Sequence, residues 1–138
     1  KDINLIENEV QSVPKDFFNK LNKNDLLFID SSHVSKIGSD VNYLILDILP
    51  SLQKGCIIHF HDIPFPFLTN PVNHPIFLAS CYWNETALLK SFLDYNNDFE
   101  IIMSQSIMNL EYKMLGNYFS DFNENKYYPN SIYLQKIN

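Results

Sequence analysis

The chain has 138 residues, of which 46% are hydrophobic and 14% aromatic, and its formal net charge is −6. This length suits one domain with a single core, and the apolar residues are too abundant for a disordered segment and too interrupted for a membrane span. The ten Lys and Arg residues form no basic stripe, so we expect no nucleic-acid partner. Two cysteines without CxxC spacing, and no signal-like apolar stretch at the start, favour a cytoplasmic protein. Residues 1–138 are therefore predicted to form one domain.

The first third of the chain predicts an extended segment, a helix and a buried strand. Residues Glu9–Val13 alternate in polarity, which predicts a short strand or extended segment that ends at Pro14. Proline suits the first turn of a helix, and we expect this helix over Lys15–Leu21. The run Asp25–Asp30 holds four consecutive apolar residues, which is typical of a strand buried on both faces of a parallel sheet. We expect this strand to be central.

A helix and a second apolar strand follow. Ser39 can cap a helix whose apolar residues recur at three- and four-residue spacing, with Pro50 bending it late and Gly55 ending it. Residues Cys56–His61 then predict a strand. A strand, a helix and a strand in this order predict a parallel crossover unit.

The second half predicts a long loop, two helices and two strands. Residues Pro64–Pro75 carry four of the seven prolines, and we interpret them as a lid or substrate wall. Asn84 can cap the next helix, after which Phe99–Met103 predicts a third strand. A helix is predicted over Asn109–Phe122, and the alternating residues Ser131–Ile137 predict the final strand.

Polar clusters follow both strands of the crossover unit. Asp30 comes after the first strand, and His61 and Asp62 end the second. Ligands of open α/β sheets bind outside the carboxyl ends of the strands, where two carboxylates and an imidazole can hold a divalent cation. Alternatively, the carboxylates cap backbone turns and His61 hydrogen-bonds locally. His61 and Asp62 are adjacent, so both can serve one site only if the strand has ended.

The other histidines allow several interpretations. His33 follows the first strand, and its ordinary pKa near neutrality suits a general base; the alternative is an exposed loop residue without a role. His59 and His61 form an HxH pair, which is typical of metal-dependent hydrolases. The further Asp and His of such sites are missing, so we interpret His59 as a buried, satisfied core residue. His74 is expected to be an exposed bystander.

Trp83, Asn84 and Glu85 open the helix after the proline-rich loop. We interpret them as an aromatic anchor, a helix cap and an acidic residue that favours the positive end of the helix dipole.

Three stretches, DLLFIDSSHVSKIGSDV, LPSLQKGCIIHFHDI and YWNETALLKSFL, carry a family resemblance. They resemble the carboxyl-terminal half of class I S-adenosylmethionine-dependent methyltransferases, especially the small-molecule and sugar O-methyltransferases. In that family a strand often written FIDxxH is followed by a helix, a pGG turn and a strand ending in HD. Here the turn is QKGC, with one glycine. The resemblance covers roughly residues 10–97 and implies a Rossmann-like sheet with a terminal antiparallel strand.

The resemblance implies methyl transfer from S-adenosylmethionine to a hydroxyl of a small molecule or sugar, assisted by Mg²⁺ or another divalent cation. It implies that Asp30, His61 and Asp62 bind the metal and that His33 is the catalytic base. The residues implied at the cofactor are Gln11, Ser12, Asp30 and Ser31.

The family's Gly-rich cofactor turn has no counterpart among the three glycines of this chain. We therefore expect the amino-terminal cofactor half of the fold to be absent and this fragment alone to be inactive. The apolar strand within Asp25–Asp30 would then have an uncovered edge, which a missing half, a partner chain or a homo-oligomer should protect.

Two other functions stay open. A metal-dependent hydrolase would use His59, His61 and Asp62, and would bind zinc tightly without affinity for S-adenosylhomocysteine. A non-catalytic half-domain would pair its apolar edge with another subunit and would be indifferent to substitution of Asp30 or His33.

Overall fold

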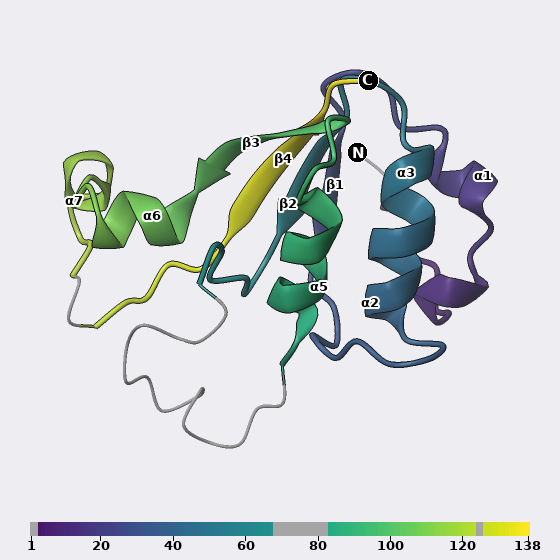
Figure 1. Ribbon diagram of the computed structural model, residues 1–138, viewed down its shortest axis with the longest axis horizontal. Helices are drawn as coiled ribbons and strands as arrows, with labels where there is room; N and C mark the ends of the chain where they lie inside the picture. Colours follow the sequence, from purple (N-terminus) through teal and green to yellow (C-terminus); the bar gives the residue numbers. More distant parts are fainter. Residues whose placement is uncertain (1–2, 68–82, 124–125) are drawn as a thin grey trace.

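The computed structural model describes residues 3–67, 83–123 and 126–138, which form an α/β fold with a four-stranded mixed sheet (Figure 1). Its strands are β1 (Leu26–Ile29), β2 (Ile57–Phe60), β3 (Phe99–Ser104) and β4 (Ile132–Lys136). They lie in the order β1-β2-β4-β3, with β1 parallel to β2 and β4 antiparallel to both β2 and β3. The predicted α/β class, parallel crossover and antiparallel last strand are confirmed, in an arrangement compatible with part of a Rossmann-like sheet.

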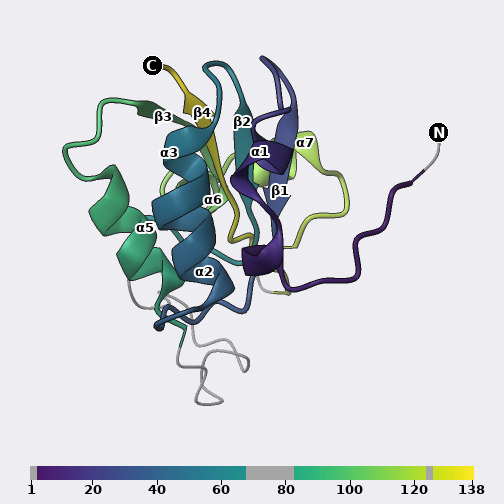
Figure 2. The ribbon, with the colours of Figure 1, turned by 90° about the vertical axis from the view of Figure 1, so that its right-hand side faces the viewer.

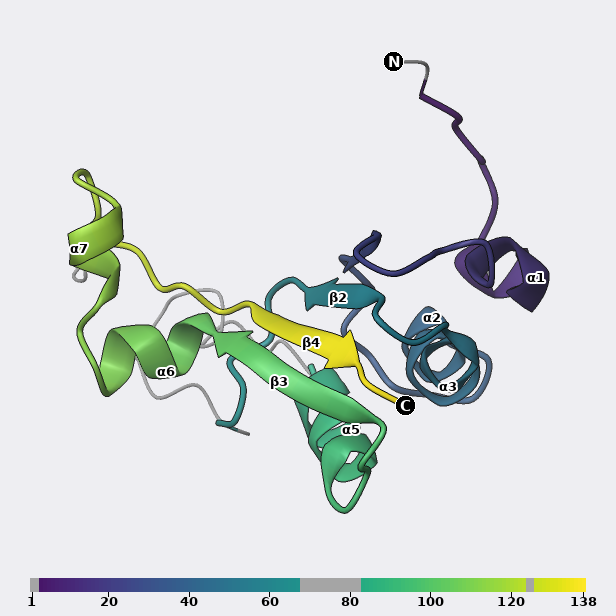
Figure 3. The same ribbon diagram turned by 90° about the horizontal axis from the view of Figure 1, so that it is seen from above.

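Helices cover one face of this sheet. The main helices of the described residues are α1 (Lys15–Phe18), the consecutive segments α2 (Asp40–Asn42), η2 (Tyr43–Ile48) and α3 (Leu49–Ser51), then α5 (Glu85–Leu93), α6 (Gln105–Leu110) and α7 (Leu115–Tyr118). Of these, α6 and α7 extend beyond the end of β3 and do not cover the sheet (Figure 1). The segments α2 to α3 lie beside α5 in front of the sheet (Figure 2). The view from above shows no described helix covering the opposite face (Figure 3). No helix of the described residues is long and apolar enough to cross a membrane.

The core lies between the helix layer and the sheet. The sheet contributes side chains that are at most 3% exposed, namely Ile29, Ile58, Phe60, Ile132 and Leu134. The helices contribute fully buried side chains, namely Val41, Ile45, Ile48, Leu49 and Leu89. Along β2 and β4, buried residues alternate with half-buried ones, so only one face of each strand enters this core.

The helix over residues 40–51 follows the prediction in its position and start. The Ser39 hydroxyl accepts a hydrogen bond from the Asn42 amide, as expected of a cap. The helix widens to π spacing directly before Pro50, whose nitrogen has no proton to donate. Gly55 follows the helix with φ +90°, and a Cβ there would lie 2.6 Å from Lys23 Cγ, so this turn needs a glycine.

β1 is an edge strand, so the prediction of a central strand buried on both faces is wrong. Among the described residues β1 pairs only with β2. Leu26 and Phe28 are each 52% exposed on the face without helices, whereas Ile29 is buried. A continuous apolar run indicates burial on both faces of a strand only in a sheet that has helices on both sides, and the described helices lie on one side here. The uncovered edge is the outcome that the methyltransferase resemblance implied.

The short strand or extended segment predicted over Glu9–Val13 is interrupted by a helical turn. Val10–Ser12 form a 3-10 turn, η1, in which the Val13 amide donates to the Val10 carbonyl. The Ser12 hydroxyl donates to the Glu9 carbonyl at 2.7 Å. These local hydrogen bonds replace a strand ladder. The following helix, α1, ends at Phe18 and not at Leu21.

The single helix predicted over Asn109–Phe122 is replaced by α6 and α7. The chain turns at Lys113, which has a left-handed φ of 52° that ends a helix. Helix α6 begins earlier than predicted, because the Ser104 hydroxyl accepts a hydrogen bond from the Ile107 amide and caps it.

Ile58→Ala should lower the free energy of unfolding by about 2–5 kcal/mol, because it leaves a cavity in the core. Ile58 is 0% exposed, whereas Ile37 is 101% exposed, so Ile37→Ala is the control and should change stability by less than about 0.5 kcal/mol. Urea unfolding followed by circular dichroism measures both. Equal effects of the two substitutions would contradict the described core.

Candidate functional site

The carboxyl ends of β1 and β2 lie side by side. Ile29 and Phe60, the last residues of the two strands, are partners in the parallel register. The amide of His61 donates to the carbonyl of Ile29 at 2.9 Å, which holds the chain leaving β2 against the chain leaving β1. The amino-terminal ends of α2 and α5 lie at this same end of the molecule (Figures 1 and 2).

Asp30, His61 and Asp62 meet at this point, as the sequence predicted. One ligand atom from each lies within 4.8 Å of the others. His61 Nδ1 is 3.8 Å from Asp30 Oδ1 and 3.4 Å from Asp62 Oδ1. This nitrogen is buried and has no hydrogen-bond partner among the described residues, and buried polar atoms are rarely left so. Two carboxylates around an unpartnered imidazole nitrogen form a donor set that suits a divalent cation.

Asp62 can join His61 because β2 has ended at Phe60. Asp62 adopts a left-handed φ of 57°, which is uncommon for a residue other than glycine and recurs at functional sites. Neither Asp30 nor Asp62 accepts a backbone hydrogen bond from a following turn in the described part of the chain. The alternative in which these carboxylates serve as caps therefore lacks its hydrogen bonds.

His33 is buried beside this cluster and is not the exposed loop residue of the alternative interpretation. It is 6% exposed. Its Nδ1 lies 2.8 Å from Glu85 Oε2. Its Nε2 faces the other way, 3.7 Å from Asp30 Oδ1 and 3.9 Å from Asp62 Oδ2. The ring therefore bridges Glu85 and the two carboxylates of the cluster.

Burial lowers the pKa of His33, but the hydrogen bond and charge of Glu85 and the charges of Asp62 and Asp30 outweigh it. The net effect raises the pKa above its ordinary value. A raised pKa makes the neutral imidazole a stronger proton acceptor.

Glu85 is a residue of the site that sequence reasoning missed. It is 1% exposed, and its Oε2 accepts a hydrogen bond from Ser31 Oγ at 2.6 Å in addition to its contact with His33. Ser31, which was predicted at the cofactor, thus points to Glu85. In the sequence, Glu85 cannot be distinguished from an acidic residue that only stabilises the helix dipole in the first turn. The available signal was that its helix begins at the carboxyl edge of a parallel sheet.

The start of α5 is attached to the loop that carries His33. The amides of Asn84 and Glu85 donate to the His33 carbonyl at 3.1 and 3.3 Å. Asn84 makes no side-chain cap for α5, contrary to prediction; its Oδ1 accepts from the Ser35 amide at 2.6 Å instead. The ring centroids of Trp83 and His33 lie 4.3 Å apart. These contacts join two segments that are distant in sequence.

A cavity of about 180 Å³ runs along β1. Its lining residues are Val10, Phe18, Leu27, Phe28, Ile29, Asp30, Ser31, Asp40 and Leu44. Of the residues predicted at the cofactor, Asp30 and Ser31 line it and Gln11 and Ser12 do not. Gln11 instead donates to the Gly38 carbonyl at 3.3 Å.

Asp40, which the sequence did not single out, lines this cavity and holds the loop before α2. Its carboxylate accepts hydrogen bonds from the Ser32 amide at 2.7 Å and the Ser32 hydroxyl at 2.6 Å. The Val41 amide adds a third at 2.9 Å. Burial alone would raise the pKa of Asp40, but these hydrogen bonds hold it below its usual range.

His59 lies outside the donor set. It is half-buried on the face without helices, stacked on Tyr133 with ring centroids 4.1 Å apart. Its Nε2 has no hydrogen-bond partner among the described residues, so the prediction of a satisfied core histidine is wrong. Burial and, less strongly, His61 lower the pKa of His59. His74 and most of the predicted lid lie outside the described residues.

The fold and the site define an α/β protein with acidic and imidazole side chains at the carboxyl ends of parallel strands. A family model described as a methyltransferase domain matches residues 2–63, which include β1, β2 and all seven of the residues predicted at the metal, as the base and at the cofactor. The match confirms the resemblance of this part of the chain to class I S-adenosylmethionine-dependent methyltransferases. No curated protein and no solved structure matches the chain.

Asp40→Asn should destabilise the protein most near neutral pH. The pKa of Asp40 is lower in the folded protein than in the unfolded chain. The carboxylate therefore contributes its full stabilisation above the unfolded-state pKa of about 4, and this stabilisation is lost as the pH falls through the folded-state pKa. Urea unfolding at several pH values should therefore show a difference from wild type that shrinks on acidification. Asp121→Asn, at an exposed carboxylate, is the control. A pH-independent difference for Asp40→Asn would contradict the hydrogen-bonded carboxylate.

Proposed function

We propose that this protein takes part in methyl transfer from S-adenosylmethionine to a hydroxyl group of a small molecule or sugar. The family match supports methyl transfer in general. The observation that carries the site assignment is the buried, unpartnered Nδ1 of His61 between the carboxylates of Asp30 and Asp62. In this proposal those three residues hold a divalent cation such as Mg²⁺, and His33 is the base.

The three side chains suit a cation that also contacts substrate. Three protein ligands leave open coordination positions, and the side chains of Asp30 and Asp62 are 55% and 32% exposed. A bound cation would hold the acceptor hydroxyl and lower its pKa.

His33 supplies a proton acceptor at the same place. With Nδ1 engaged by Glu85, the nitrogen left for substrate is Nε2, which faces Asp30 and Asp62. An acceptor hydroxyl between these carboxylates would lose its proton to Nε2 as its oxygen attacks the methyl carbon of S-adenosylmethionine, whose carbon–sulfur bond breaks to release S-adenosylhomocysteine. The raised pKa of His33 favours this transfer.

The cavity along β1 offers a partial cofactor site. Val10, Ile29 and Leu44 give it an apolar wall suited to a nucleoside ring, and Asp30 and Ser31 place polar atoms at one end. S-adenosylmethionine, when bound, would supply the electrophilic methyl group. The open edge of β1 supports the inference that the chain corresponds to the carboxyl-terminal part of a methyltransferase sheet, with the Gly-rich cofactor turn contributed by other strands.

The two alternatives have weaker support. A hydrolase built on His59, His61 and Asp62 needs His59 as a ligand, but the donor set of the described residues contains Asp30 in its place. A non-catalytic half-domain agrees with the exposed Leu26 and Phe28 of β1. That interpretation gives no role to the buried pair of His33 and Glu85.

Asp62→Asn and His61→Ala should each weaken binding of Mn²⁺ to the chain by more than the roughly 10–100-fold that follows loss of an outer-shell partner. His61→Ala removes a nitrogen donor from the three-residue set, and Asp62→Asn replaces a charged carboxylate donor by a weaker neutral amide oxygen. Calorimetric titration with MnCl₂ measures the affinities, and Asp121→Asn is the control at an exposed carboxylate away from the site. Equal affinities in wild type and all three variants would remove the metal from the proposal.

S-adenosylhomocysteine should bind the complete natural protein that contains this chain. There Asp30→Asn should weaken Mn²⁺ binding and leave affinity for S-adenosylhomocysteine nearly intact, because the proposal makes Asp30 chiefly a metal ligand. Calorimetry with each compound separates these effects. No binding of S-adenosylhomocysteine by the complete protein would refute the methyltransferase proposal.

A further inference from the structure

We propose that Glu85 is a positioning residue for His33. Its carboxylate fixes the orientation of the imidazole and keeps the proton of the neutral ring on Nδ1, so that Nε2 presents its lone pair to the space beside Asp30 and Asp62. The use of that lone pair in catalysis rests on the proposed function. The orientation and the tautomer do not.

The chemistry of the contact between Glu85 and His33 determines where the ring proton lies. Glu85 Oε2 lies 2.8 Å from His33 Nδ1, and an ionised carboxylate can only accept hydrogen bonds. The proton of this bond must then sit on Nδ1. A neutral imidazole carries one proton, so Nε2 is left as its acceptor nitrogen.

The carboxylate of Glu85 is itself held in place by Ser31. Ser31 Oγ donates to the same oxygen, Oε2, at 2.6 Å. Ser31 Oγ also accepts a hydrogen bond from the His33 amide at 3.0 Å. The serine therefore links the backbone of His33 to the carboxylate that binds its ring. Glu85 is 1% exposed, so water does not compete for these bonds.

The start of α5, which carries Glu85, also holds the backbone of His33. The amides of Asn84 and Glu85 both donate to its carbonyl. His33 has a left-handed φ of 59°, a conformation that a non-glycine residue keeps only when its surroundings hold it. Ring and backbone are thus fixed by one structural element, the start of α5.

A glutamate serving only the helix dipole has no need of this geometry. Dipole stabilisation requires an acidic side chain in the first turn and works at the surface. Glu85 instead is buried and points at an imidazole from the loop after β1. Burial of a carboxylate is costly unless it is hydrogen-bonded, and Oε2 of Glu85 contacts both Ser31 and His33.

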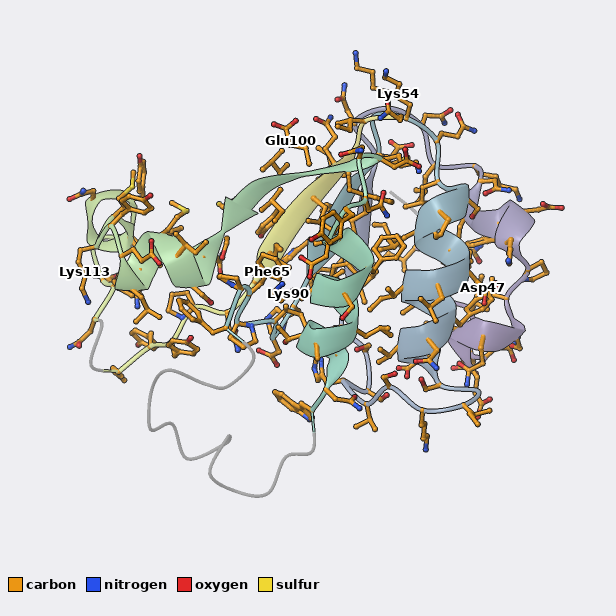
Figure 4. The ribbon with its side chains drawn as sticks, viewed as in Figure 1. Asp47, Lys54, Phe65, Lys90, Glu100 and Lys113 are labelled. Atoms are coloured by element: carbon orange, nitrogen blue, oxygen red, sulfur yellow. The ribbon has the colours of Figure 1, made fainter. Side chains whose placement is uncertain are left out.

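The test is the tautomer of His33, read by long-range ¹H–¹⁵N NMR of the 138-residue chain above the pKa of the ring. Wild type should show His33 protonated on Nδ1. Glu85→Leu, which replaces the acceptor by an apolar side chain, should lose the Nδ1–H signature. Glu100→Leu should retain it, because Glu100 is exposed and lies near the other end of the sheet (Figure 4).

A wild-type His33 protonated on Nε2 would overturn the proposal without any variant, so failure of Glu85→Leu to fold leaves it testable. An Nδ1–H signature that persists in folded Glu85→Leu would overturn it as well. The measurement uses neither metal nor cofactor. Failure of the metal and S-adenosylhomocysteine titrations would therefore refute the proposed function and leave the positioning of His33 by Glu85 standing.

Discussion

In-register parallel pairing of β1 with β2 is the constraint on which the site depends. It ends both strands at the same level, at Ile29 and Phe60, so the residues that follow emerge together. Strand pairing alone brings Asp30 and His61 together. The left-handed backbone conformation of Asp62 turns its carboxylate toward them. A slip of one residue would invert the faces of the strand and separate the three side chains.

The helix layer supplies the second half of the site. Packing of α5 on the sheet puts its first turn against the loop that follows β1, where Glu85 reaches His33. Only one sheet face takes part in this packing, which leaves Phe28, His59 and Tyr133 in a row on the face without described helices. The site is therefore built by one layer of helices and the strand ends, independently of whatever covers the other face.

The strands, the capped helix at 40–51 and the cluster of Asp30, His61 and Asp62 could be predicted because local patterns determine them. Apolar runs, the Ser39 cap and strand-end polarity are all readable along the chain. The edge position of β1 could not be read from its apolar run, because burial depends on which faces helices cover. The partnership of His33 with Glu85 was also hidden, since 52 positions separate the residues and only the packing of α5 joins them.

The proposed divalent cation lies at the carboxyl ends of β1 and β2, and paramagnetic broadening by Mn²⁺ tests this position most directly. In a ¹H–¹⁵N spectrum of the chain, substoichiometric Mn²⁺ should erase the amide signals of residues 29–31 and 60–63 first. Signals near Phe99 and Lys136, at the opposite end of the sheet, should persist longest. Uniform broadening, or broadening that begins at another acidic segment, would contradict a metal centre on Asp30, His61 and Asp62.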